Sequence, residues 1–270
     1  MRHLKENLIP LAVLLSFFIA LIFIASCSES TSSENVQGQI KITMIDAPAG
    51  FDQVNISVVR VEVHITGADS SSGWVVINDI ESTYDLLTLT NGATAVLSNN
   101  PLDAGHYTQI RLIIGAGSNV VVDGVVYPLE IPGGEQTGIK LNQEFEIQEG
   151  IEYELILDFD TENSILLTGS GQYIMNPVIR VVPAEISGTI SGKINPANAD
   201  GSVYALSGTE TIITTADTTT GLFKLMALIQ GTYDVKVSSG NAAYNDTTIS
   251  NVIVVAKQNT DLGTINLSPK

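Results

Sequence analysis

Short runs in which apolar and polar residues alternate recur from about residue 38 to the end of the chain. In the first run, Ile40, Ile42 and Met44 alternate with polar residues, so one face of a strand lies on a core and the other in water. Gly, Asn and Pro separate the runs, and charged residues make up only 15% of the chain. This composition suits strands better than helices. The sequence therefore predicts an all-β fold of sandwich or barrel type.

Two local details sharpen this prediction. The alternation in residues 54–65 changes phase at Val58 and Val59, which predicts a bulge or a strong bend. Asp123 and Gly124 both tolerate positive φ and predict a tight hairpin. Further strands of this part are expected at residues 74–77, 84–89, 107–114, 120–122, 125–131, 139–147, 151–159 and 173–182.

The pattern restarts after Pro183, which predicts two β-sandwich domains of immunoglobulin-like or transthyretin-like type, at residues 38–184 and 185–270. In the second domain, Gly221 is expected to permit a tight turn. A first strand at residues 186–194 is followed by strands at residues 203–206, 211–215, 221–225, 231–237, 245–249, 252–255 and 261–267.

Residues 139–159 predict a hairpin, because two alternating runs are joined by Gln148, Glu149 and Gly150, and Gly150 can adopt the left-handed conformation. Pairing Ile147 with Ile151 brings several apolar residues face to face on the inner side. On the outer side, the same register places acidic residues opposite each other.

Such opposed carboxylates suggest a calcium site, because they repel each other unless a cation or solvent offsets the charge. The candidate ligands are Glu144, Glu154, Asp158 and Asp160. The segment lacks the glycine and the distal glutamate of a calcium-binding loop. A solvated acidic face, with no cofactor, is the alternative.

The N-terminus carries a targeting signal. Arg2 and Lys5 precede an almost wholly apolar stretch at residues 8–25, and Cys27, the only cysteine of the chain, follows. The ending Ile24-Ala-Ser-Cys27 resembles the lipobox of bacterial lipoprotein precursors. That resemblance implies a lipoprotein signal peptide at residues 1–26, diacylglyceryl attachment (with fatty acids such as palmitate) to the Cys27 thiol, and acylation of the new N-terminus.

Residues 27–37 then comprise the lipidated cysteine and a flexible tether rich in Ser and Glu. An uncleaved membrane anchor is the alternative, because residues 8–25 approach the lower length limit of a spanning helix. Ser28 is not the Asp that, in lipoprotein sorting, favours retention at the inner membrane. The expected location is therefore the cell envelope, at the outer membrane.

The chain is strongly acidic, with 12 basic and 29 acidic residues and a formal net charge of −17. Removing residues 1–26 takes away two basic residues and one acidic residue, which changes the net charge to −18. A surface this acidic excludes nucleic acid as a partner, and membrane association is expected to come from the lipid.

Four segments of the first domain resemble a domain-of-unknown-function family (DUF4382-type) that occurs in bacterial and archaeal lipoproteins. They are residues 42–48 (ITMIDAP), 107–112 (YTQIRL), 155–160 (LILDFD) and 176–180 (NPVIR). The resemblance implies a β-rich fold in a lipoprotein setting and brings no activity or site residues with it.

The second domain resembles the carboxypeptidase regulatory-like, or transthyretin-like, sandwich modules of exported proteins. The matching segments are residues 190–194 (ISGKI), 217–223 (DTTTGLF) and 231–235 (GTYDV). In that family the module is an accessory domain for stability, spacing or adhesion, so the resemblance implies no catalytic residue.

No catalytic constellation is visible, because the mature chain holds only His64 and His106 and no free thiol. The leading interpretation is a non-catalytic surface lipoprotein that serves as a binding or adhesion module, with an envelope protein as a possible partner. Glycan binding for a nutrient-uptake system is one alternative, with Trp74 displayed on a loop as the candidate contact; a buried sandwich tryptophan is the competing interpretation. A structural subunit that assembles by strand addition is another.

Overall fold

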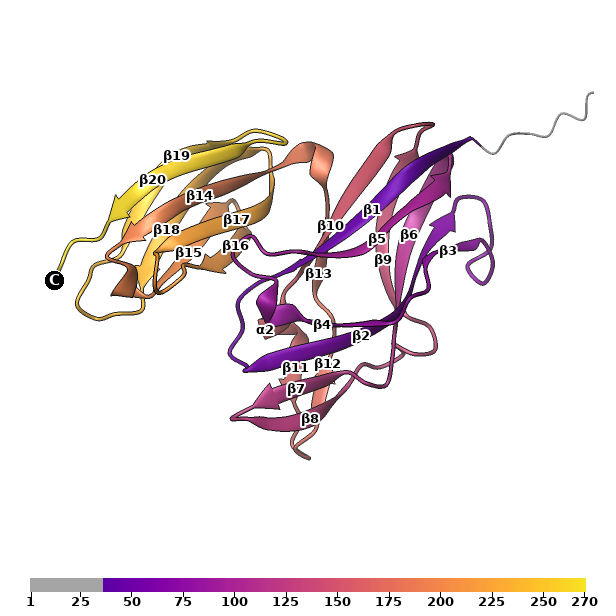
Figure 1. Ribbon diagram of the computed structural model, residues 1–270, viewed down its shortest axis with the longest axis horizontal. Coiled ribbons are helices and arrows are strands. Elements are labelled where there is room, and N and C mark those ends of the chain that lie inside the picture. Colours follow the sequence, from indigo (N-terminus) through magenta and orange to yellow (C-terminus); the bar gives the residue numbers. More distant parts are fainter. Residues whose placement is uncertain (1–35) are drawn as a thin grey trace, which may run out of the picture. The chain divides into compact units, whose positions relative to one another are not determined.

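The computed structural model describes residues 36–270, in which strands predominate and helices are confined to a few short turns (Figure 1). The predicted all-β, sandwich-type fold class is confirmed. The predicted signal peptide, Cys27 and most of the tether lie outside the described residues. Among residues 36–270, no helix is long and apolar enough to cross a membrane.

The strands fall into two sets that do not pair with each other in the described part of the chain. The first set, which we call the first sandwich, consists of β1 (Gln37–Asp46), β2 (Gln53–Ile65), β3 (Trp74–Asn78), β4 (Ser82–Asp85), β5 (Ala95–Asp103), β6 (Gly105–Ile114), β7 (Asn119–Val122), β8 (Val125–Glu130), β9 (Ile139–Ile147), β10 (Glu152–Phe159), β11 (Ile165–Leu167), β12 (Tyr173–Met175) and β13 (Ile179–Pro183). Two short helical turns interrupt it, η1 (Leu86–Thr88) and α2 (Thr161–Ser164).

The second set, the second sandwich, consists of β14 (Ser187–Asn195), β15 (Gly201–Ser207), β16 (Glu210–Thr215), β17 (Leu222–Ile229), β18 (Gly231–Ser239), β19 (Thr247–Val254) and β20 (Asn259–Asn266), with short turns η2 (Ala184–Ile186) and η3 (Ala197–Ala199). Its two sheets have the orders β17-β14-β20 and β16-β15-β18-β19. Their inner faces enclose one apolar core that includes Ile190, Phe223 and Val235.

The first sandwich has two sheets of unequal size. The smaller sheet has the order β13-β10-β1-β5, and β1 and β10 run parallel in it. The larger sheet runs β11-β12-β8-β7-β2-β6-β9, and β3 and β4 also pair with β2. As the alternation predicted, Ile40, Ile42 and Met44 are fully buried in the core between the sheets.

The phase change in β2 coincides with an irregularity in strand pairing, in line with the predicted bulge or bend. The pairing of β2 with β6 shifts register between Val58 and Arg60. The N-terminal half of β2 pairs with β4 and β7, whereas its C-terminal half pairs with β3 and β6. The two halves of β2 therefore pair with different strands.

The predicted hairpin at residues 139–159 is wrong. β9 pairs with β6 in the larger sheet, whereas β10 pairs with β1 and β13 in the smaller sheet. Gly150 does adopt positive φ, but its N–H donates to Gln37 O, so the turn carries the chain from one sheet to the other. Phe145 and Tyr153 still meet, with ring centroids 5.6 Å apart.

Candidate functional site

The four candidate calcium ligands do not form one cluster, although the charge of Asp160 acts on Asp158. Glu154 forms an ion pair with Lys41 at 3.0 Å and accepts a hydrogen bond from Thr43, whereas the exposed Glu144 lies 3.8 Å from His106. Asp160 is not in a strand; its side chain caps α2 by accepting from the N–H of Asn163. Within residues 36–270, no group of three or more His, Cys, Asp or Glu side chains is placed to hold a metal ion. The structure does not bring the four carboxylates together, and the strand pairing that suggested their site is wrong.

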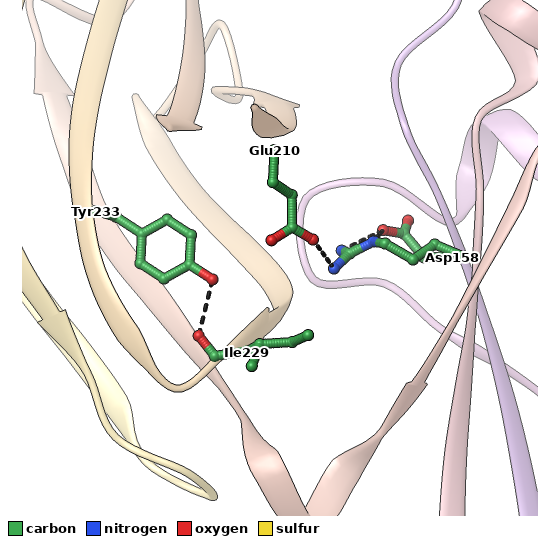
Figure 2. Close-up of polar contacts among 5 residues, drawn as sticks. Asp158, Glu210, Ile229 and Tyr233 are labelled. Carbon is green, nitrogen blue, oxygen red and sulfur yellow. Dashed lines mark hydrogen bonds and ion pairs between the residues drawn. The ribbon is translucent and has the colours of Figure 1, made fainter. Parts of the chain in front are cut away.

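Asp158, the remaining candidate, belongs to an ion-pair network with Arg180 and Glu210 (Figure 2). Arg180 donates to Asp158 Oδ2 from Nε at 3.2 Å and from Nη2 at 2.7 Å, and its Nη1 donates to Glu210 Oε1 at 2.8 Å. Burial raises the pKa of Asp158, and the Arg180 charge opposes that rise. Nearby in Figure 2, the Tyr233 hydroxyl donates to Ile229 O at 2.8 Å. The Arg180 guanidinium thus links a carboxylate of β10 to a carboxylate of β16, which is a structural role.

Trp74 begins β3 and is half-buried. The Arg111 guanidinium lies over the indole, 4.0 Å from the ring centroid, and the indole N–H donates to Ser70 O. Arg111 also pairs with Glu62, which is only 4% exposed. A ligand that stacked on this face of Trp74 would have to displace a guanidinium that neutralises a buried carboxylate.

A second place has the shape of a binding site. A groove of about 460 Å³ is lined by residues at the β8–β12 end of the larger sheet. Figure 1 shows β8 and β12 at the lower end of the first sandwich. Its walls come from β8, from the following loop at residues 131–136, from the turn after β6 and from the start of β12.

Two tyrosines line the groove. Tyr127 and Tyr173 are both half-buried, with ring centroids 5.2 Å apart and planes tilted by 52°. The predicted Asp123–Gly124 turn is confirmed: both residues have positive φ and close the β7–β8 hairpin. β12 then pairs in parallel with β8, which places Tyr173 opposite Leu129 and close to Tyr127.

The polar groups of the groove fall into two kinds: Ser118 and Gln172 form hydrogen bonds within the protein, whereas other side chains do not. In the described part of the chain, the side chains of Glu130, Glu135 and Gln136 make no hydrogen bond or ion pair, and neither do the hydroxyls of the two tyrosines. No Lys, Arg or His lines the groove. It therefore presents two aromatic rings, two carboxylates and several free donors.

The sequence analysis did not find this groove. Tyr127 and Tyr173 lie 46 residues apart, and only the parallel β8–β12 pairing brings them together. One available signal is the loop after β8, Ile131-Pro-Gly-Gly-Glu-Gln136, whose Pro and Gly residues interrupt the strand pattern before two polar side chains.

The family of this chain follows from its match to a known family of protein domains. The family described as "Domain of unknown function (DUF4382)" matches residues 37–177, which is more than half of the chain. This chain belongs to the DUF4382 family. The predicted resemblance of the first domain is thereby confirmed, and the match runs from β1 to β12, so it includes the groove.

Other comparisons with this DUF4382 chain are weaker. No curated protein matches it. Among solved structures, a type II cohesin–X-dockerin complex from Acetivibrio cellulolyticus is 27% identical, covering 30% of this chain and 58% of that chain with a TM-score of 0.24. A minor pilin of Streptococcus agalactiae is 9% identical, covering 85% of this chain and 96% of that one, with a TM-score of 0.25. A putative adhesin from Bacteroides ovatus is 8% identical, with coverage of 86% and 93% and a TM-score of 0.26. TM-scores this low carry no argument about function.

Proposed function

We propose that this DUF4382 chain is a non-catalytic binding module, held at the cell envelope by a lipid on Cys27. The observation that carries the proposal is the groove of Tyr127 and Tyr173. Its volume lies in the range of about 300–1,000 Å³ that is typical of ligand sites. Within the described residues, the side chains of Glu130, Glu135 and Gln136 have no hydrogen-bond or ion-pair partner, so they are available to a ligand.

Catalysis is disfavoured by the surroundings of the two histidines. His64 is buried, with its Nδ1 3.3 Å from Thr108 Oγ1 and its Nε2 3.0 Å from Asp69 O. His106 is on the surface beside Glu144. Neither histidine lies among the groove residues, so none is available there as a general base.

We also propose the domain division at residues 38–184 and 185–270, with a carboxypeptidase regulatory-like module in the second part. The division is supported by the strand pairing, which is closed within each set. We further propose that this second module acts as a spacer. Support comes from Asn91 of the first sandwich, which holds the module by its side chain: it donates to Leu222 O at 3.2 Å and accepts from Lys224 N at 2.7 Å. Those groups belong to β17, an edge strand, so this amide occupies an edge that another chain could otherwise pair with.

Anchoring is tested by metabolic labelling with an alkyne-tagged palmitate. The full chain is expected to take up the label and to lose residues 1–26, and Cys27→Ala is expected to abolish both. Uptake of no label, together with an unprocessed N-terminus in the membrane fraction, would support the uncleaved anchor instead.

Binding is tested by isothermal titration of the full chain, purified in mild detergent, with probes of three classes: neutral oligosaccharides, anionic oligosaccharides and basic peptides. Binding of any class that weakens in Tyr173→Ala, but not in Tyr204→Ala on β15, supports a binding groove. Absence of binding in all three classes would contradict it.

A structural subunit is the alternative, and the edge strand β19 favours it because Ile253 is 64% exposed there. Polymer ladders on gels of native membranes, abolished by Ile253→Lys, would support strand addition. A strictly monomeric chain would exclude it.

A further inference from the structure

We infer that the groove binds a neutral saccharide, with a sugar ring stacked on Tyr127 or Tyr173 and its hydroxyls bonded to Glu130, Glu135 and Gln136. This inference rests on the proposed binding function and names the class of ligand for the same groove.

The first support is the mixed character of the surface. Tyr rings present flat apolar faces at a low cost in conformational entropy, and the C–H face of a pyranose can stack on such a ring. The exposed Pro128 also lines the groove and extends the apolar surface. The exposed carboxylates and amide surround it, as in ligand sites where a few polar groups orient a ligand on an apolar floor.

The second support is charge. Two carboxylates and no basic side chain line the groove, and the chain carries a net charge of −17. Anionic ligands such as phosphates or uronic acids would therefore be repelled. This leaves neutral and cationic ligands.

The hydrogen-bond donors and acceptors of the groove favour a neutral ligand over a cationic one. Glu130 and Glu135 only accept hydrogen bonds when ionised, whereas the Gln136 amide and the tyrosine hydroxyls also donate. An ammonium or guanidinium group has no acceptor for those donors. A sugar hydroxyl both donates and accepts, so vicinal hydroxyls can satisfy both kinds of group at once.

The third support is that the wall of the groove is preformed. In the loop after β8, Gly134 N donates to Ile131 O at 2.9 Å and Thr137 N donates to Gly133 O at 2.9 Å. Ile114 N donates to Gly134 O at 3.0 Å, which ties the loop to β6. A wall that is already ordered loses little conformational entropy when a ligand binds.

The test is isothermal titration of the full chain, in mild detergent, with hexamers of β-1,4-linked glucose, xylose, mannose and N-acetylglucosamine and of α-1,4-linked glucose. A galacturonate hexamer and a hexalysine peptide are the charged probes. We expect one or more neutral hexamers to bind with an affinity independent of salt, because no ion pair forms. Tyr173→Ala is expected to weaken that binding about tenfold or more.

Tyr173 also packs on the core of the first sandwich, so its variant must be shown to fold, by circular dichroism. Gln136→Ala and Glu135→Gln avoid this difficulty, because within the described residues both side chains are exposed and form no hydrogen bond or ion pair. Each is expected to weaken binding several-fold, whereas Tyr204→Ala, a half-exposed tyrosine of the second sandwich, leaves it unchanged.

The outcomes separate the two proposals. Binding of hexalysine alone, lost in the groove variants, would overturn the saccharide inference and keep the binding function. Binding of the galacturonate hexamer alone would overturn the charge argument in the same way. If no probe binds, both proposals fail. If a neutral hexamer binds equally well to all groove variants, its site is elsewhere and the inference is wrong.

Discussion

Asp46 at the end of β1 is expected to make the stability of the first sandwich depend on pH. Its side chain is 6% exposed. Oδ1 accepts from Thr161 Oγ1 at 2.8 Å and from Thr161 N at 3.2 Å, but Oδ2 has no hydrogen-bond partner. Burial, with a smaller contribution from the charge of Asp158, raises the pKa of Asp46 from 3.8 to about 7. The hydrogen bonds from Thr161 limit the rise.

The sign follows from the two states of the chain. Between pH about 4 and 7 the folded chain keeps the proton on Asp46, whereas the unfolded chain releases it. The stability that this carboxyl contributes is therefore fully present below pH about 4 and is lost as the pH rises to about 7. A pKa difference of about three units, at about 1.4 kcal/mol per unit, corresponds to about 4 kcal/mol as an upper value.

Asp46→Asn removes the ionisation and keeps an oxygen that can accept from Thr161. At pH 8 the variant is expected to be more stable than the parent by up to about 4 kcal/mol, and near pH 4 this advantage should disappear. The burial of Asp158, which is the main cause of its own raised pKa, is common to both proteins and cancels in the difference. Asp123→Asn, an exposed position with positive φ that Asn tolerates, controls for the loss of one negative charge.

The assay is urea unfolding of the full chain in mild detergent at several pH values, followed by the fluorescence of Trp74. It is the only tryptophan in the chain and lies in the first sandwich, as Asp46 does. A stability difference between Asp46→Asn and the parent that is equal at pH 4 and pH 8 would refute the reasoning.

Three further outcomes are expected. Gly221→Ala should destabilise the second sandwich by about 3 kcal/mol or more, because φ is +76° and a Cβ would lie 2.1 Å from Ile194 O. The control is Gly208→Ala, where φ is +59° and the surrounding space is open, so the substitution should cost only about 1 kcal/mol. Equal melting temperatures of the two variants would contradict this expectation. Arg111→Met should lower the free energy of unfolding, measured with urea, by about 2–3 kcal/mol, because the buried Glu62 then pairs with Arg60 alone. Its control is Lys140→Met: Lys140 lies near Trp74 but does not pair with Glu62, so stability should change by less than about 0.5 kcal/mol. Millimolar calcium should leave the melting temperature unchanged, since the four candidate carboxylates are apart; an increase that Glu144→Gln with Glu154→Gln abolishes would restore the calcium hypothesis.

Strands with a clear alternation could be predicted from the sequence. β1, β2 and most strands of the second sandwich lie where the apolar period placed them. β5 was missed because Ser98, Asn99, Asn100 and Pro101 interrupt its pattern. It is an edge strand next to β1, where a proline and polar residues are tolerated. Residues 173–182 were predicted as one strand but form β12 and β13, which belong to different sheets.

The candidate site could not be predicted for a related reason. Local periodicity says which face of a strand is buried, but not which strand lies beside it. The groove depends on β12 lying parallel to β8, a pairing between strands separated by β9, β10 and β11 in the chain. Trp74, by contrast, drew attention as the only tryptophan, yet Arg111 covers its ring.

The error at residues 139–159 shows the same limit most clearly. A two-sided alternation joined by a short glycine turn is equally compatible with a hairpin within one sheet and with an arch between two facing sheets, because both bring the same apolar residues toward one core. In this chain β1 decides between them: it lies beside β10 in parallel register, with Ile40 opposite Tyr153 and Ile42 opposite Leu155. β10 therefore has β1 on one side and β13 on the other, which leaves no edge for β9. The acidic residues predicted to face each other are separated as a consequence, and Glu154 pairs with Lys41 of β1 instead.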